Sequence, residues 1–177
     1  MTPANAITIA GLALSVYGAA NLNEVSGVLI FGAGRVLDIA DGYVARRTHA
    51  SRFGALLDAS ADKAAVAAAL AGGLYFEAVP VAVLGTIAAA NIINASANTY
   101  SESKKQEPKT STAGKYYMFG YNAAFGAFAL GAAMEGNSTL GSAGWAIFAA
   151  TTPLAIKASW DYTKAALAAR KSSMRAK

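Results

Sequence analysis

The sequence predicts an all-α membrane protein in which six transmembrane helices form one bundle. Apolar residues make up 55% of the 177 residues, and charged residues only 14%. Six apolar segments follow one another, and no linker between them is long enough to separate two domains. Basic residues gather in alternate connections between these segments, as expected when a chain crosses a membrane repeatedly. We therefore expect a single domain over residues 1–177.

Each apolar segment is close to the length that spans a bilayer, about 20 residues. Ala and Gly are abundant, which keeps the mean hydropathy at +0.35 while letting helices approach closely. The first segment lacks the basic start and the cleavage site of a signal peptide, so we expect it in the mature protein. The expected segments are 6–20, 25–45, 56–76, 79–99, 116–134 and 140–158.

The charge of the connections predicts the orientation in the membrane. Three connections carry one acid each and no base, namely Glu24, Glu77 and Glu135. By the positive-inside rule the basic side faces the cytosol, which places the protein in the cell membrane as a multi-pass protein. A soluble Ala-rich bundle does not predict this alternation. The bases are Arg46, Arg47 and Arg52 in one connection, Lys104, Lys105, Lys109 and Lys115 in the other, and Lys164, Arg170, Lys171, Arg175 and Lys177 in the tail.

Two broad function classes are disfavoured by the same composition. The net charge of +5 is explained by topology signals that face anionic lipid headgroups, so we expect no nucleic-acid partner. The chain has no cysteine, which excludes disulfides and thiolate metal sites. Any metal site must therefore use oxygen or imidazole ligands. The single histidine, His49, lies in a basic connection and is expected to be a solvated loop residue.

Four of the five aspartates lie between residues 38 and 62. Asp38 and Asp41 share one face of a helix, and Asp58 and Asp62 share one face of the next helix. At a rise of about 1.5 Å per residue, all four fall in the cytosolic third of a hydrocarbon core about 30 Å thick. Two antiparallel helices would bring them to similar depths. Arg35 is expected to form an ion pair with Asp38 or with a neighbouring helix.

Carboxylates at this depth need a compensating charge. Each costs roughly 2.5–3.5 kcal/mol at the centre of a spanning helix, and four unpaired carboxylates would also repel one another. Two divalent cations would neutralise the cluster, and all-oxygen ligation suits Mg²⁺ or Mn²⁺. Helix caps or solvated loops explain most short acidic motifs, but they do not explain this spacing over two helices. The stretch therefore predicts a two-metal phosphoryl-transfer site that faces the cytosol.

The spacing D-x-x-D-G-x-x-A-R, then G-x-x-x-D-x-x-x-D, from Asp38 to Asp62 resembles the signature of the CDP-alcohol phosphatidyltransferase family. The opening TPANAITIAG over residues 2–11 is also similar to the start of that family. Together with the six segments, the resemblance covers roughly residues 2–160. It implies a phospholipid-synthesising enzyme that binds two Mg²⁺ or Mn²⁺ ions and forms a homodimer.

The resemblance also implies roles for individual residues. Asp38, Asp41 and Asp58 would bind metal, and Asp62 would bind metal and act as the general base. An acceptor hydroxyl would attack the lipid-side phosphorus of a CDP-linked lipid such as CDP-diacylglycerol, and CMP would leave. Residues implied in binding the CDP-lipid are Asn5, Thr8, Gly42, Ala45, Arg46 and Gly54.

The acceptor is less well defined by the sequence. A polyol phosphate needs cations near the metals, and the candidates are Lys104, Lys115 and Lys157. Lys157 lies inside an apolar segment, although Asp161 one turn later could simply pair with it. Similarity to phosphatidylglycerophosphate synthases around Asp62 favours glycerol 3-phosphate. Similarity to phosphatidylinositol phosphate synthases near the N-terminus leaves inositol phosphate, or another alcohol, as the alternative.

A cation channel or transporter is the alternative of another class, because it too can hold carboxylates inside a membrane. It would more often spread them along a pathway, whereas here all four share one depth. A cluster of aromatic residues in the fifth segment is expected to form a belt at the membrane interface. These residues are Tyr116, Tyr117, Phe119 and Tyr121.

Overall fold

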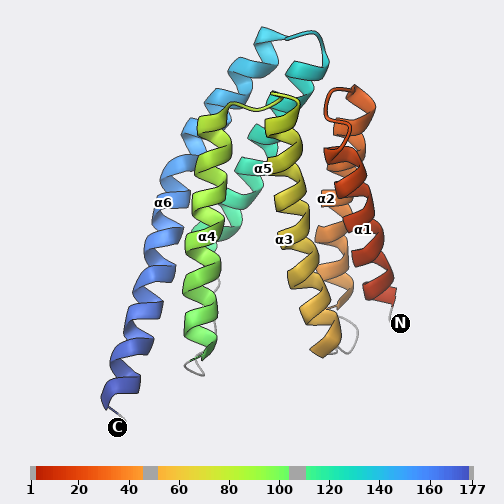
Figure 1. The fold of residues 1–177 in the computed structure, drawn as a ribbon. Helices are drawn as coiled ribbons and strands as arrows, with labels where there is room; N and C mark the ends of the chain where they lie inside the picture. The colour runs from red at the N-terminus through yellow and green to blue at the C-terminus, as the bar shows by residue number, and fades with distance from the viewer. Residues whose placement is uncertain (1–2, 46–51, 104–110, 176–177) are drawn as a thin grey trace. The chain divides into compact units, whose positions relative to one another are not determined.

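The computed structural model describes residues 3–45, 52–103 and 111–175. These residues form six helices and no strand, which confirms the all-helical class and the order of the predicted segments (Figure 1). The helices are α1 (Pro3–Ala19), α2 (Val25–Ala45), α3 (Arg52–Tyr75), α4 (Val81–Ser103), α5 (Thr112–Ala133) and α6 (Ser138–Arg175).

Among the described residues, two helices have both the length and the apolar composition of a membrane span. They are α4 over Val81–Ser103 and α6 over Ser138–Arg170, while the apolar part of α1 is shorter, Ala4–Ala19. Helices α2 and α3 are long enough, at 21 and 24 residues. Both carry charged residues of the expected site, and neither is among the candidate spans found in the described residues.

Helix α6 does not end near residue 158, as its apolar segment predicted, but continues to Arg175. The added part contains no Gly or Pro and is rich in Ala, Lys and Arg, which favour helix even when they are not apolar. Side-chain pairs one turn apart support it. Lys157 lies 3.2 Å from Asp161, and the ammonium of Lys164 lies 5.0 Å from the centre of the Trp160 ring.

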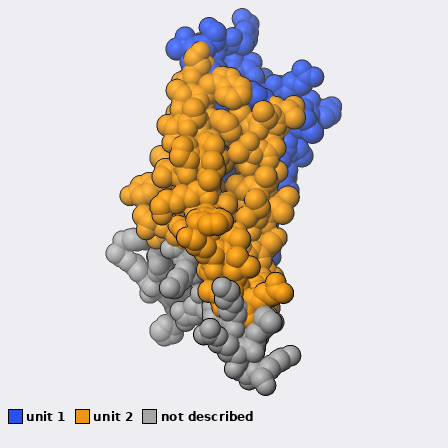
Figure 2. Space-filling model, turned by 90° about the vertical axis from the view of Figure 1, so that its left-hand side faces the viewer, with its two compact units in different colours: residues 1–80, 126–141 blue, residues 81–125, 142–177 orange. Residues whose placement is uncertain are grey.

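The chain divides into two compact units, coloured separately in Figure 2. Unit 1 comprises residues 1–80 and 126–141, and therefore holds α1, α2, α3 and the turn between α5 and α6. Unit 2 comprises residues 81–125 and 142–177, and holds α4 with most of α5 and α6. Each unit has its own packing.

In unit 1, α1 packs against both α2 and α3. Glycines allow the backbones of α1 and α2 to touch, as small residues do in membrane helices. A Cβ placed on Gly34 would lie 2.6 Å from the Ser15 nitrogen and 2.7 Å from the Gly11 oxygen, so no larger residue fits there. The facing pairs Gly18–Phe31, Ser15–Gly34 and Gly11–Asp38 define an antiparallel register between the two helices.

In unit 2, polar and aromatic groups form part of the core. The amide of Asn94 on α4 donates to the Tyr117 hydroxyl on α5 at 2.6 Å. Tyr121 stacks on Phe148 of α6, with ring centroids 5.4 Å apart. Tyr117 and Tyr121 are each only 3% exposed. The prediction of one aromatic belt is therefore wrong for these two residues.

Helical periodicity explains this result. Tyr117 and Tyr121 are one turn apart and share the inward face of α5. The other two members of the cluster point outward, because Tyr116 is 64% and Phe119 is 71% exposed. The expected belt is thus split between the core of unit 2 and its surface.

Replacing Gly34 with Ala is predicted to destabilise the protein, because the new methyl group would overlap the α1 backbone. Overpacking of this kind costs about 1–3 kcal/mol. The matched control is Gly32→Ala on the same helix, where nothing lies within 4 Å of the added Cβ. Thermal unfolding in detergent, followed by far-ultraviolet circular dichroism of the helices, should show a lower Tm for G34A and an equal or higher Tm for G32A. Equal Tm values for all three proteins would contradict the close contact of α1 and α2.

Candidate functional site

Arg35 connects α2 to α3 through two of the predicted site residues. Its Nη2 atom donates to Asp62 Oδ1 of α3 at 2.8 Å, and it lies 3.4 Å from Asp38 Oδ2 one turn later on α2. The side chains of Arg35, Asp38 and Asp62 are 14%, 24% and 35% exposed. The predicted pairing of Arg35 is confirmed for both alternatives, the neighbouring turn and the neighbouring helix. Asp38 and Asp62 therefore converge on one positive charge.

The other two predicted ligands lie on the same helices, one turn from this pair. Asp58 precedes Asp62 on α3 and is exposed, and Asp41 follows Asp38 on α2. Because the helices run in opposite directions, both lie toward the end of unit 1 where α2 ends and α3 begins (Figure 1). The side chain of Asp41 is outside the described part of the structure. Among the described side chains, no three His, Cys, Asp or Glu residues gather closely enough to hold a metal ion.

The register of α1 against α2 brings two further predicted residues to the depth of the site. Continuing the antiparallel pairing of Gly11 with Asp38 places Thr8 at the level of Asp41 and Asn5 at the level of Val44. Both side chains are buried although they are polar. The Thr8 hydroxyl donates back to the Ala4 carbonyl at 3.1 Å. The N-terminal part of α1 thus lies beside the aspartate-bearing turns of α2.

The remaining CDP-lipid residues lie around the connection from α2 to α3. Gly42 and Ala45 are in the last turns of α2, and Gly54 is in the first turn of α3. Arg46 lies outside the described residues, as does His49. The backbone therefore places the described members of this set at one end of unit 1, the end that also carries Asp41 and Asp58.

The described donors fit a divalent cation chemically. Carboxylate oxygens are the ligands that Mg²⁺ and Mn²⁺ prefer. Asp38 and Asp62 come from different helices, yet each directs an oxygen to the same guanidinium nitrogen. The contact with Arg35 involves Oδ2 of Asp38 and Oδ1 of Asp62. Two carboxylates that converge on one cation from different helices are donors that a divalent cation could also use.

The three lysines predicted to bind an acceptor phosphate lie outside the described part of unit 1. Lys115 and Lys157 belong to unit 2, and Lys104 lies outside the described residues. Lys157 pairs with Asp161 at 3.2 Å, as the alternative prediction stated. Asp161 also accepts a hydrogen bond from the Ser111 hydroxyl at 3.3 Å. Lys115 is exposed in the first turn of α5. Their role as phosphate ligands stays a prediction.

Sequence reasoning missed a polar group inside unit 2. Asn94 is buried on the inward face of α4, and its Oδ1 atom has no hydrogen-bond partner among the described residues. The buried hydroxyl of Tyr121 also has none there. Tyr121 lines a groove of about 690 Å³ between α4 and α6, together with Ile93, Lys157 and Trp160. The signal available in the sequence was an amide within an apolar segment, at helical spacing from its buried neighbours.

Comparison with known proteins gives one clear result. The model of the CDP-alcohol phosphatidyltransferase family matches residues 1–156, which include α1 to α5 and the first half of α6. No significant match was found among curated proteins or solved structures. Members of the family transfer a phosphate-linked group from a CDP-alcohol to an alcohol acceptor in phospholipid biosynthesis, in general with divalent cations. The chain therefore belongs to the CDP-alcohol phosphatidyltransferase family and is a transferase of this class.

Proposed function

We propose that the protein transfers a phosphatidyl or related lipid-phosphate group from a CDP-linked lipid to the hydroxyl of a polyol phosphate, and releases CMP. The observation that carries this proposal is the convergence of Asp38 and Asp62, from two helices, on one positive charge. Both residues lie within residues 1–156, which the family model matches, and the resemblance in sequence makes them the first and last aspartates of the signature. The proposed acceptor is glycerol 3-phosphate, and inositol phosphate or another alcohol is the alternative.

The proposed setting is a multi-pass protein of the cell membrane with six spanning helices and a site open to the cytosol. The apolar composition of α4 and α6 supports membrane insertion directly. Helices α2 and α3 would cross with their carboxylates gathered around cations, which reduces the cost of burying charge. The alternation of acidic and basic connections supports the cytosolic orientation. The proposed partners are the lipid substrate, the acceptor, membrane lipids and a second copy of the chain.

In this proposal Asp38, Asp41, Asp58 and Asp62 hold two Mg²⁺ or Mn²⁺ ions. Bound there, the ions would neutralise the phosphates of the donor and stabilise the charge that develops on the leaving CMP. Burial of Asn5 and Thr8 at the level of Asp41 and Val44 supports a role for α1 in shaping the nucleotide end of the site. Gly42 and Gly54, which have no side chain, would allow a nucleotide to approach the backbone near the connection of α2 and α3.

Asp62 is proposed to accept the proton of the acceptor hydroxyl. The hydroxyl oxygen forms a new bond to the lipid-side phosphorus, and the bond from that phosphorus to the oxygen of CMP breaks. The proton moves to a carboxylate oxygen of Asp62, and CMP leaves as a phosphate monoester. General base catalysis of this kind contributes typically 10²–10⁴-fold to the rate.

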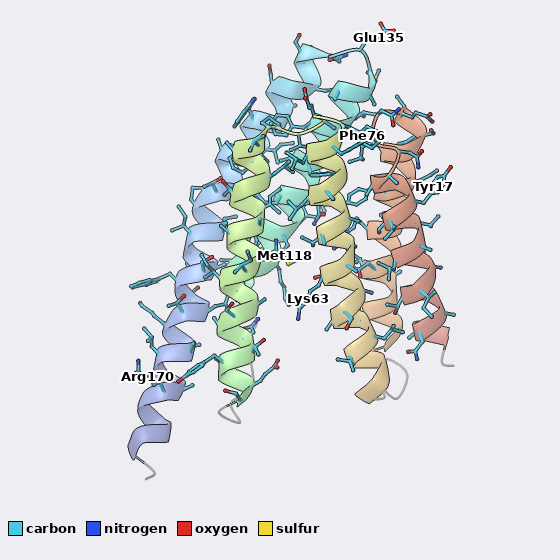
Figure 3. The ribbon with its side chains drawn as sticks, in the orientation of Figure 1. Tyr17, Lys63, Phe76, Met118, Glu135 and Arg170 are labelled. Carbon is cyan, nitrogen blue, oxygen red and sulfur yellow. The ribbon has the colours of Figure 1, made fainter. Side chains whose placement is uncertain are left out.

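The Asp62→Asn variant is predicted to lower CMP release from CDP-diacylglycerol by at least about 10²-fold, because it removes the proton acceptor and a metal ligand. Purified protein would be assayed with Mg²⁺ and glycerol 3-phosphate, with CMP measured by chromatography. The control variant Glu135→Gln removes the same charge from the exposed turn between α5 and α6 (Figure 3) and should keep normal activity.

Normal CMP release by Asp62→Asn would refute the assignment of Asp62 as the base. Wild-type protein that conducts ions in liposomes but releases no CMP would overturn the proposed function in favour of a channel. EDTA should stop CMP release by the wild-type protein, and added Mg²⁺ or Mn²⁺ should restore it.

The acceptor is tested by comparing glycerol 3-phosphate, inositol phosphate and glycerol in the same assay. We expect product from glycerol 3-phosphate. Lys115→Gln should raise KM for that acceptor about tenfold, because a charged hydrogen bond to its phosphate is lost, while KM for the CDP-lipid stays unchanged. The matched control is Lys164→Gln, since Lys164 packs over Trp160. Product from inositol phosphate alone would show that the preferred acceptor is wrong. Equal changes in KM for Lys115→Gln and Lys164→Gln would show that Lys115 does not bind the acceptor phosphate.

A further inference from the structure

The contact of Arg35 with the carboxylates has a consequence for metal binding, if the proposed function holds. Both of its contacts use the Nη2 atom, and both are made to oxygens of proposed metal ligands. Arg35 is also the most buried member of the group, at 14% exposure. The guanidinium therefore occupies a position between α2 and α3 where a cation compensates two acidic side chains.

Charge makes this position incompatible with full metal loading. Four aspartates carry four negative charges, which two divalent cations neutralise. A guanidinium held on the same carboxylate oxygens adds a further positive charge close to those ions. Like charges at such short range repel strongly in a partly buried site. Either the arginine moves away from the carboxylates when metal binds, or it weakens metal binding.

We infer that Arg35 is an internal counter-ion that competes with divalent cations for Asp62 and Asp38. Without metal it holds the two helices together through their carboxylates. When metal binds, it gives up its contact with Asp62, the shorter of the two at 2.8 Å. This exchange links metal loading to catalysis, because Asp62 Oδ1 accepts the guanidinium hydrogen bond until the ions arrive and is then freed to accept a substrate proton.

A purely structural ion pair leads to a different expectation. Such a pair would persist in the metal-bound protein, and its removal would loosen the arrangement of α2 and α3 and weaken metal binding. The sign of the change in metal affinity after removal of Arg35 therefore separates the two roles. Activity is not needed for this distinction.

The test measures Mn²⁺ affinity by isothermal titration calorimetry and thermal stability in EDTA for the wild-type protein and Arg35→Gln. We expect R35Q to bind Mn²⁺ about tenfold more tightly, the scale of a lost charged hydrogen bond to the competing group. Its Tm in EDTA should fall, and Mn²⁺ should raise that Tm by more than it raises the wild-type value. The control variant is Lys63→Gln, which removes an equal charge from an exposed neighbour of Asp62 on α3 (Figure 3). Its Mn²⁺ affinity should stay close to that of the wild-type protein.

A second variant, Arg35→Lys, keeps the charge and guards against loss of folding in R35Q. Lysine presents a compact ammonium in place of the planar guanidinium and should compete less well for the carboxylates. The Mn²⁺ affinity of R35K should therefore lie between that of the wild-type protein and that of R35Q. Unchanged or weaker Mn²⁺ binding by R35K and R35Q, with clear binding by the wild-type protein, overturns the inference but leaves the proposed function intact. An equal increase in Mn²⁺ affinity in K63Q also overturns it, because the increase would then follow from the loss of any positive charge near the site. Absence of Mn²⁺ binding in every protein overturns the inference and the proposed function together.

Discussion

Carboxylates inside an apolar helical protein need a shared positive charge, and the arrangement of α2 and α3 follows from that requirement. Asp38 and Asp62 lie on different helices, and Arg35 reaches from one to the other to contact both. Neither carboxylate is buried alone. In the proposed enzyme, divalent cations supply this positive charge when they bind. Arg35 and the metal ions would therefore neutralise the same carboxylates in turn.

The scaffold that holds this group is built from small residues. Helix α1 packs against both α2 and α3, and its backbone touches α2 at Gly34, the residue immediately before Arg35. Close contact of this kind fixes the height of α2 along α1 with little freedom to slide. It also sets Thr8 beside the level of Asp41, so the polar face of α1 and the aspartates of α2 are positioned by one set of contacts.

Much of the fold could be predicted because the six apolar segments coincide with six helices. The end of α6 could not be predicted from hydropathy, since the residues after 158 are helical by propensity and by side-chain pairs such as Lys157 with Asp161. The aromatic cluster was misjudged because its members were treated as one group, although Tyr117 and Tyr121 lie on the inward face of α5. The spacing of the aspartates indicated the candidate site and its chemistry. For Arg35 the sequence indicated a partner either in Asp38 or on a neighbouring helix, but it did not identify Asp62, because the choice of a tertiary partner depends on helix packing that one sequence does not determine.

Electron paramagnetic resonance of bound Mn²⁺ would show whether aspartates of α2 and α3 form one site for two metal ions. Ions that share a two-metal site lie about 3.5–4 Å apart. We expect two Mn²⁺ ions per chain, with spectra that show magnetic coupling between them. The coupling should disappear in both Asp38→Asn and Asp62→Asn, because each removes a ligand from a different helix. A single bound ion, two uncoupled ions, or coupling that survives both substitutions would show that these aspartates do not form a shared two-metal site.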